Sequence, residues 1–226
     1  MRSLEMTTKM SDAEIIAQTV AFVKFELQDA EKGHDWWHIE RVRRIALTIA
    51  KTEPADPFIV ELSALLHDIA DSKFNDGNES IGVEKATAFL RNIAVDEGVV
   101  EHIGRIIANI SFKGGNVTPD FHSAELAVVQ DADRLDAMGA IGIARAFNYG
   151  GFMGRELYNP AIKPVLGMTR EQYKSSTAPT INHFYEKLLT LKDRMNTVTG
   201  RKMAERRHQF MELYLSQFFR EWDGME

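Results

Sequence analysis

The chain has 226 residues, of which 44% are hydrophobic, and its formal net charge is −6. This length fits one globular domain or two small ones, with enough apolar material for a sizeable core. Lysine and arginine are scattered along the chain, which does not favour a nucleic acid or an anionic membrane as partner. The absence of cysteine excludes a disulfide framework, a thiolate nucleophile and a cysteine-ligated zinc site.

No targeting or membrane segment is expected in this sequence. The first ten residues, MRSLEMTTKM, contain no apolar stretch of the kind found in a signal peptide. No run approaches the ~18 apolar residues that a membrane-spanning helix needs. We therefore expect a soluble protein of the cytoplasm.

Helical periodicity runs through most of the chain, and no strand pattern is found. A capping-box pattern, Ser11 followed by Glu14, predicts the start of the first helix. The next helix has Val42 and Ile49 on its apolar face, and His38 stands at the head of the same row. A core histidine that bonds to a backbone carbonyl is the alternative to a functional role. His34 lies before this helix in our interpretation.

A third helix begins at Asp56 and Pro57, an N-cap residue followed by proline at the first helical position. It carries His67 and Asp68 where further apolar residues would be expected, and it runs into a polar loop that starts at Asp71. Neighbouring helical residues point about 100° apart, so both reach one point only above the groove between them. A metal ion there would offset the cost of burying the carboxylate. A capping or supporting role is the alternative for this pair.

Further helices are predicted at about residues 79–91, 96–111 and 120–148, the last bent at Gly139 or Gly142. The 120–148 helix carries aspartates at positions 131, 133 and 136 among apolar residues. The neighbours of Asp133 one turn away are apolar, so its carboxylate needs a cationic partner. Arg134 has two open roles, an ion pair with Asp131 or a contact with a substrate phosphate.

The pattern lapses between Tyr149 and Ala178, where glycine and proline are frequent. A connection of this length inside a compact domain is commonly a lid or a binding loop, which is our prediction. Its basic residues are Arg155, Lys163 and Lys174. A surface insertion that packs elsewhere is the alternative. Two helices, at about 180–194 and 200–222, close the chain.

Together, His38, the His67–Asp68 pair and a late aspartate predict a centre of two nitrogen and two oxygen ligands in a helical bundle. Imidazole and carboxylate suit manganese, iron, magnesium, nickel or zinc. The order of these residues resembles that in the HD-domain metal-dependent phosphohydrolases. It is most similar to a small bacterial branch that includes nucleotide pyrophosphohydrolases. The similar words are residues 34–42 (HDWWHIERV), 65–71 (LLHDIAD), 110–114 (ISFKG) and 130–137 (QDADRLDA).

The resemblance covers about residues 20–220 and implies an all-α fold, one HD domain over residues 1–226. Within it we place a metal-binding core at about 20–148, the lid-like connection at 149–178 and the C-terminal helices at 180–222. By position in the family pattern, the metal ligands are His38, His67, Asp68 and Asp133. Asp131 remains the rival for the last ligand.

The function implied is hydrolysis of a nucleotide or another small phosphate ester by a metal-activated water. His34 or Asp71 would act as general acid or base. The candidates for binding substrate are Lys73, Lys113, Arg134, His183 and Lys187. A cyclic-dinucleotide phosphodiesterase is less favoured, because no Gly-Tyr-Pro word follows the His-Asp pair.

The alternative function is a non-catalytic helical domain, stapled by the metal, that binds a nucleotide or a protein partner. A homodimer stays open as an alternative to a monomer.

Overall fold

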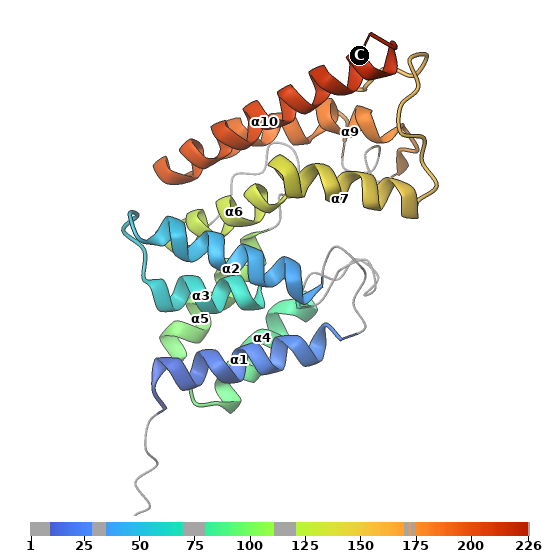
Figure 1. The fold of residues 1–226 in the computed structure, drawn as a ribbon. Helices are drawn as coiled ribbons and strands as arrows, with labels where there is room; N and C mark the ends of the chain where they lie inside the picture. Colours follow the sequence, from blue (N-terminus) through green and yellow to red (C-terminus); the bar gives the residue numbers. More distant parts are fainter. Residues whose placement is uncertain are drawn as a thin grey trace, which may run out of the picture.

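The computed structural model describes residues 10–28, 35–69, 80–110, 121–169, 172 and 175–225. Within these residues the chain is helical and has no strand, which confirms the all-α prediction (Figure 1). None of their helices is long and apolar enough to span a membrane. The elements are α1 (Asp12–Glu26), α2 (Trp36–Ala50), α3 (Pro57–Leu66), α4 (Ser80–Asn92), α5 (Glu97–Ile110), α6 (Ala124–Asp136), α7 (Gly139–Phe152), α9 (Thr180–Glu186), the 3₁₀ helix η2 (Leu188–Arg194) and α10 (Val198–Trp222).

The predicted helix starts at Ser11 and Asp56 are confirmed. The Ser11 hydroxyl accepts a hydrogen bond from the Glu14 amide, and the Glu14 carboxylate accepts one from the Ser11 amide, which completes the capping box. Asp56 caps α3 by accepting from the Phe58 amide at 2.8 Å. At the start of α2, Asp35 accepts from the His38 amide at 3.0 Å. His38 is therefore fixed in the first turn of its helix.

Two large apolar clusters form the core, and α2 and α3 contribute to both. One cluster joins α1, α3, α4 and α5 and includes Ile39 of α2. The other joins α2 and α3 to α6, α7, α9 and α10, and includes Val42 and Met211. In Figure 1, α2 and α3 accordingly lie between α1 and α4 on one side and α7 and α10 on the other. Helices α2 and α3 thus form the layer between the two clusters.

The single bent helix predicted at 120–148 is instead two helices. The first, α6, ends at Asp136, and α7 begins at Gly139, whose φ of +69° is a left-handed conformation that favours glycine. A Cβ added at Gly139 would lie 3.1 Å from Cγ of Arg207 in α10. The Arg207 guanidinium also donates to the carbonyl of Leu135 at the end of α6. This contact with α10 accompanies the break, which local sequence patterns do not reveal.

The predicted lid-like connection begins later than expected, because α7 continues to Phe152. Its described part packs against the C-terminal end of α10. The Tyr158 ring lies 5.1 Å from that of Trp222 and 5.2 Å from that of Phe219, between centroids. Arg155 donates to the carbonyl of Ser176 at 2.7 Å, which ties the two ends of the connection together. Closure over the metal centre stays a prediction, and Lys174 lies outside the described residues.

Candidate metal centre

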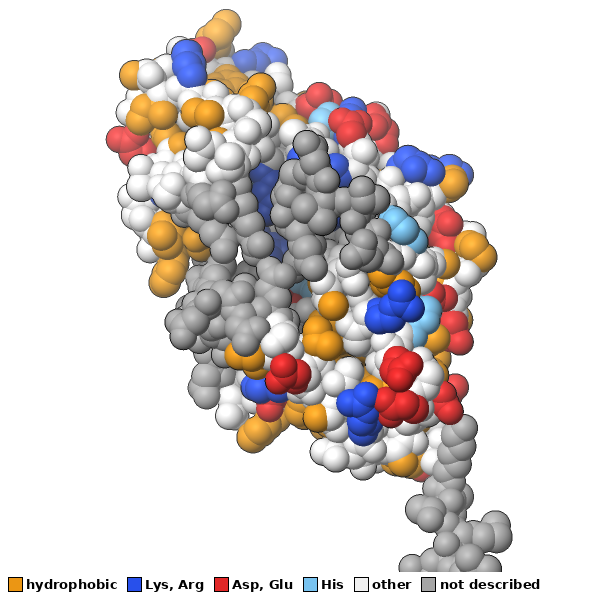
Figure 2. All heavy atoms as spheres, turned by 180° about the vertical axis from the view of Figure 1, so that it is seen from behind, with side chains coloured by type: hydrophobic (Ala, Val, Ile, Leu, Met, Phe, Trp, Pro, Cys, Tyr) orange, Lys and Arg blue, Asp and Glu red, His pale blue; other side chains and the backbone are white. Residues whose placement is uncertain are grey.

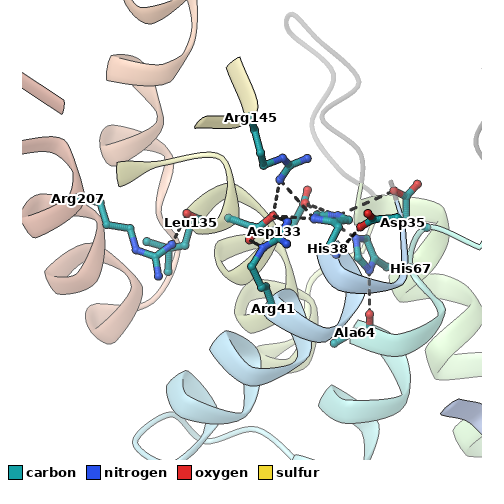
Figure 3. A network of polar contacts seen from close by, with 11 residues as sticks. Asp35, His38, Arg41, Ala64, His67, Asp133, Leu135, Arg145 and Arg207 are labelled. Atoms are coloured by element: carbon teal, nitrogen blue, oxygen red, sulfur yellow. Dashed lines mark hydrogen bonds and ion pairs between the residues drawn. The ribbon is translucent and has the colours of Figure 1, made fainter. Parts of the chain in front are cut away.

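Two buried histidines face each other at the middle of the molecule. His38 comes from the first turn of α2, and His67 directly follows the last residue of α3. Their ring centroids are 5.3 Å apart, and the rings meet at 65° (Figure 3). Their side chains are only 2% and 4% exposed, so bulk water can form few hydrogen bonds with these imidazole rings.

The hydrogen bonds of the two rings determine where each carries its proton. Nδ1 of His38 lies 2.8 Å from a carboxylate oxygen of Asp136, and Nδ1 of His67 lies 2.9 Å from the carbonyl oxygen of Ala64. A carbonyl and an ionised carboxylate can only accept, so each Nδ1 carries a proton and donates it. In the neutral ring, the Nε2 atom is then left with a lone pair. For His67, this Nε2 is buried and has no hydrogen-bond partner among the described residues.

Two carboxylates reach the same place as the two lone pairs. Oδ1 of Asp133 lies 3.6 Å from Nε2 of His38 and 3.9 Å from Nε2 of His67. Oδ2 of Asp68 lies 3.9 Å from Nε2 of His38. These separations are too long for hydrogen bonds, but atoms that each lie ~2 Å from one ion are separated by about this much. The ligand atoms of His38, His67 and Asp133 all lie within 4.8 Å of one another, and Asp68 joins the group through His38.

A further buried carboxylate, Asp136, supports this group and was not singled out by the sequence analysis. Arg41 approaches both of its oxygens, with Nε 2.7 Å from Oδ1 and Nη2 3.0 Å from Oδ2, and Arg145 of α7 also donates to Oδ2. Burial raises the pKa of Asp136, but the hydrogen bonds from His38 and Arg41 and the charge of Arg145 outweigh it. The pKa of Asp136 is therefore held well below its ordinary value, and the carboxyl is ionised.

A helical spacing in the sequence points to these supporting residues. Asp136 follows Asp133 by three positions, and Arg41 follows His38 by three positions, so each pair shares one helix face. Helices α2 and α6 pack with these faces together, as the contacts between His38 and Asp136 and between Arg41 and Asp136 show. The signal becomes useful only once these two helices are known to be neighbours.

Asp131, the rival for the last ligand, has other partners. Its buried carboxylate accepts hydrogen bonds from the Asn196 amide, the Thr197 amide and the Thr197 hydroxyl, each at 2.8 Å. Thr197 is the N-cap of α10, so Asp131 fastens the start of that helix to α6. Arg134 lies 3.5 Å from Asp131 and donates to the Arg194 carbonyl at 2.6 Å. Of the two roles left open for Arg134, the structure shows the pairing with Asp131.

We expect Asp131→Asn to lower the free energy of unfolding by about 1–3 kcal/mol. The substitution replaces a buried charged acceptor by an amide, whose NH₂ group would face the N–H and O–H donors of Asn196 and Thr197. Urea denaturation followed by circular dichroism measures this change. An unchanged midpoint and slope would show that the Asp131 contacts do not hold α10 in place.

Several other predicted residues lie outside the described residues, or in and just after a helix that contributes none of the four side chains. His34, Asp71, Lys73 and Lys113 belong to the first group. His183 lies in α9, and Lys187 directly follows that helix. Burial, together with the nearby charges of Lys187 and Arg155, lowers the pKa of His183 to about 3. Figure 2 shows lysine and arginine side chains at several separate places on one face of the molecule, among acidic and apolar ones.

The fold and the site define a helical protein with a centre of two histidines and two aspartates. Residues 36–138, which include all four side chains, match the HD domain family. The uncharacterized protein YpgQ of Bacillus subtilis is 38% identical over 218 residues, 96% of this chain and 98% of that protein. The chain belongs to the HD-domain family.

Solved structures agree with this assignment. A crystal structure described as an HD-superfamily hydrolase, from Bacillus thuringiensis, is similar with a TM-score of 0.76 and 43% identity, covering 94% of this chain and 99% of that one. The crystal structure of Bacillus subtilis YpgQ in complex with ADP has a TM-score of 0.74 and 36% identity, covering 94% of this chain and 97% of that one.

Proposed function

We propose that the protein is a metal-dependent phosphohydrolase that acts on a nucleotide or a related small phosphate ester. The observation that carries the proposal is the pair of buried Nε2 lone pairs, both facing the Asp133 carboxylate. Without a cation, Nε2 of His67 is a buried acceptor that lacks a donor, which is costly. His38, His67, Asp68 and Asp133 would hold the ion. Such a nitrogen and oxygen set suits manganese, iron, magnesium, nickel or zinc.

When bound, a divalent ion supplies Lewis acidity to a phosphoryl oxygen and lowers the pKa of a water molecule. The chain supplies the rest of the chemistry. Asp133 is 43% exposed, so substrate and water would reach the centre from its side. The water oxygen would form a bond to phosphorus as the bond to the leaving oxygen breaks. His34 or Asp71 would accept the water proton, and Lys187 and His183, with Lys73 and Lys113, would contact the phosphates.

A nucleotide is the substrate class that the comparisons support best. YpgQ, a relative that matches nearly the whole chain, has been crystallised in complex with ADP. The net charge of −6 argues against a nucleic acid and leaves phosphate binding to local basic residues.

A product screen tests the proposal. The metal-loaded protein would be incubated with nucleoside mono-, di- and triphosphates, with separate assays for phosphate and pyrophosphate. We expect release of one of these products from at least one nucleotide, and no release by His67→Ala. Nucleotide binding without any release, across all five metals, would favour the non-catalytic alternative and overturn the proposal.

The lid-like connection offers a kinetic prediction. If its basic residues contact phosphate at closure, replacing Lys163 or Arg155 with Gln should raise KM or lower kcat by up to about tenfold, with metal affinity unchanged. Lys51→Gln is the control, because Lys51 is an exposed lysine that follows the opposite end of α2 from His38. Steady-state kinetics measure the effect. If KM and kcat match the wild-type values in both variants, the connection does not bind substrate through these charges.

A further inference from the structure

Among the described contacts, Asp136 forms a hydrogen bond with His38 but none with His67. We propose that Asp136 is a positioning residue, whose carboxylate holds His38 in the tautomer with the proton on Nδ1 and the lone pair of Nε2 directed at the centre. The inference rests on the proposed function in that it takes this centre to be a metal site. It assigns a role to a residue that the proposed mechanism does not use.

The two histidines are held by different kinds of acceptor. His67 donates to the carbonyl of Ala64, one turn earlier in the same stretch of chain, so its tautomer follows from local backbone structure. His38 donates to Asp136, which lies 98 positions later and on another helix. A hydrogen bond to an ionised acceptor is about twice as strong as one between neutral groups. The Nδ1 atom of His38 therefore faces side chains from other helices, Asp136 at 2.8 Å and Nη1 of Arg145 at 3.4 Å. Asp136 is the acceptor, so changing it should affect His38 but not His67.

Two arginines restrict how Asp136 can turn. Arg41, on the same helix as His38, donates Nε to Oδ1 and Nη2 to Oδ2, so it grips both oxygens. Arg145 comes from α7 and donates to Oδ2, the oxygen that also accepts from His38. Oδ2 is thus the point where α2, α6 and α7 meet. The side chain of Asp136 is 1% exposed, so water does not compete for these bonds.

A purely structural role is the competing explanation, in which Asp136 only neutralises two partly buried arginines, Arg41 and Arg145. The two explanations differ in what happens to His38. An asparagine at position 136 has one oxygen and one NH₂ group, whereas the site presents donors to both positions. If the NH₂ group faces His38, the ring must accept, and its proton moves to Nε2. If the oxygen faces His38, the NH₂ group meets Nε of Arg41, and the bond to His38 is weaker because the charge is lost.

The tautomer can be observed directly by long-range ¹H–¹⁵N NMR of the metal-free, ¹⁵N-labelled protein, at a pH at which the ¹⁵N chemical shifts show both rings to be neutral. His38→Gln and His67→Gln assign the two rings. In the wild type we expect both rings to be protonated at Nδ1. In Asp136→Asn we expect His38 to gain signal from the Nε2-protonated tautomer, while His67 stays as it was. Asp131→Asn is the matched control, since it alters a buried aspartate of the same helix without touching His38.

Calorimetric titration with Mn²⁺ gives a second readout. We expect Asp136→Asn to bind Mn²⁺ about 10- to 100-fold more weakly, the usual effect of removing a side chain that orients a metal ligand. Asp131→Asn should keep the wild-type affinity.

The inference is overturned if wild-type His38 carries its proton on Nε2, a result that needs no variant to fold. It is also overturned if Asp136→Asn changes neither the His38 tautomer nor the Mn²⁺ affinity. The outcome is separable from that of the proposed function. A protein that binds Mn²⁺ but hydrolyses no nucleotide would refute the hydrolase while leaving the role of Asp136 to be decided by the spectrum.

Discussion

Replacing Asp133 with Asn is expected to lower kcat/KM by at least about two orders of magnitude, because a charged metal ligand is replaced by a neutral amide. Its Oδ1 lies within 4 Å of Nε2 of both histidines, so it stands at the centre of the group. Its partial exposure means that the change should disturb the fold little. Steady-state kinetics with the best substrate from the screen, at saturating metal, measure the effect.

The matched control for this variant is Asp131→Asn, two positions earlier in α6. Its side chain contacts Asn196 and Thr197 and not the histidines. We expect activity per folded molecule near that of the wild type, at a lowered stability. The reverse result, with Asp131→Asn inactive and Asp133→Asn active, would make Asp131 the ligand and contradict the site described above.

Metal binding should raise the melting temperature substantially, and His67→Ala should abolish the rise. An ion present at 100 times its Kd stabilises the folded state by about 2.7 kcal/mol. For a chain of this size, each kcal/mol shifts the melting temperature by roughly 2–4 °C, so the expected rise is roughly 5–11 °C. Differential scanning fluorimetry with and without Mn²⁺ measures it. His67 is the most informative position to change. Its Nε2 has no hydrogen-bond partner among the described residues, so a metal ion could bind there without displacing one.

His102→Ala is the control for the thermal shift. His102 is a partly buried histidine of α5 that pairs with Glu125 at 3.3 Å, away from His38 and His67. Its loss can change the basal melting temperature but should keep the full metal-induced rise. Asp68→Ala, tested in the same way, decides whether Asp68 is a ligand. A full rise in His67→Ala would place the metal elsewhere.

Much of the fold was accessible from the sequence, because local patterns encode where helices begin. The capping box at Ser11 and the Asp56–Pro57 start are read from a few neighbouring residues, and both were confirmed. The break between α6 and α7 could not be predicted in the same way, because it involves the positive φ of Gly139 and the packing of Arg207 from α10. Glycine in an apolar stretch predicts a bend as readily as a break.

Part of the candidate site could also be predicted from local patterns. His38, His67 and Asp68 stand out as polar residues on apolar helical faces, which a single helix can show. Choosing between Asp131 and Asp133 requires knowing which helix covers each face of α6. The structure puts α10 against Asp131 and the two histidines against Asp133. The role of Asp136 likewise depends on the pairing of α2 with α6, which no local pattern reports.

The central claim is that His38, His67, Asp68 and Asp133 hold one divalent ion. Crystals grown from metal-stripped protein and soaked in Mn²⁺ test it most directly, by anomalous difference density at a wavelength where manganese scatters anomalously. We expect a single strong peak between the two Nε2 atoms and the Asp133 carboxylate, about 2.0–2.4 Å from its ligand atoms. Density that shows no peak among these side chains, at a Mn²⁺ concentration that supports activity, would contradict it.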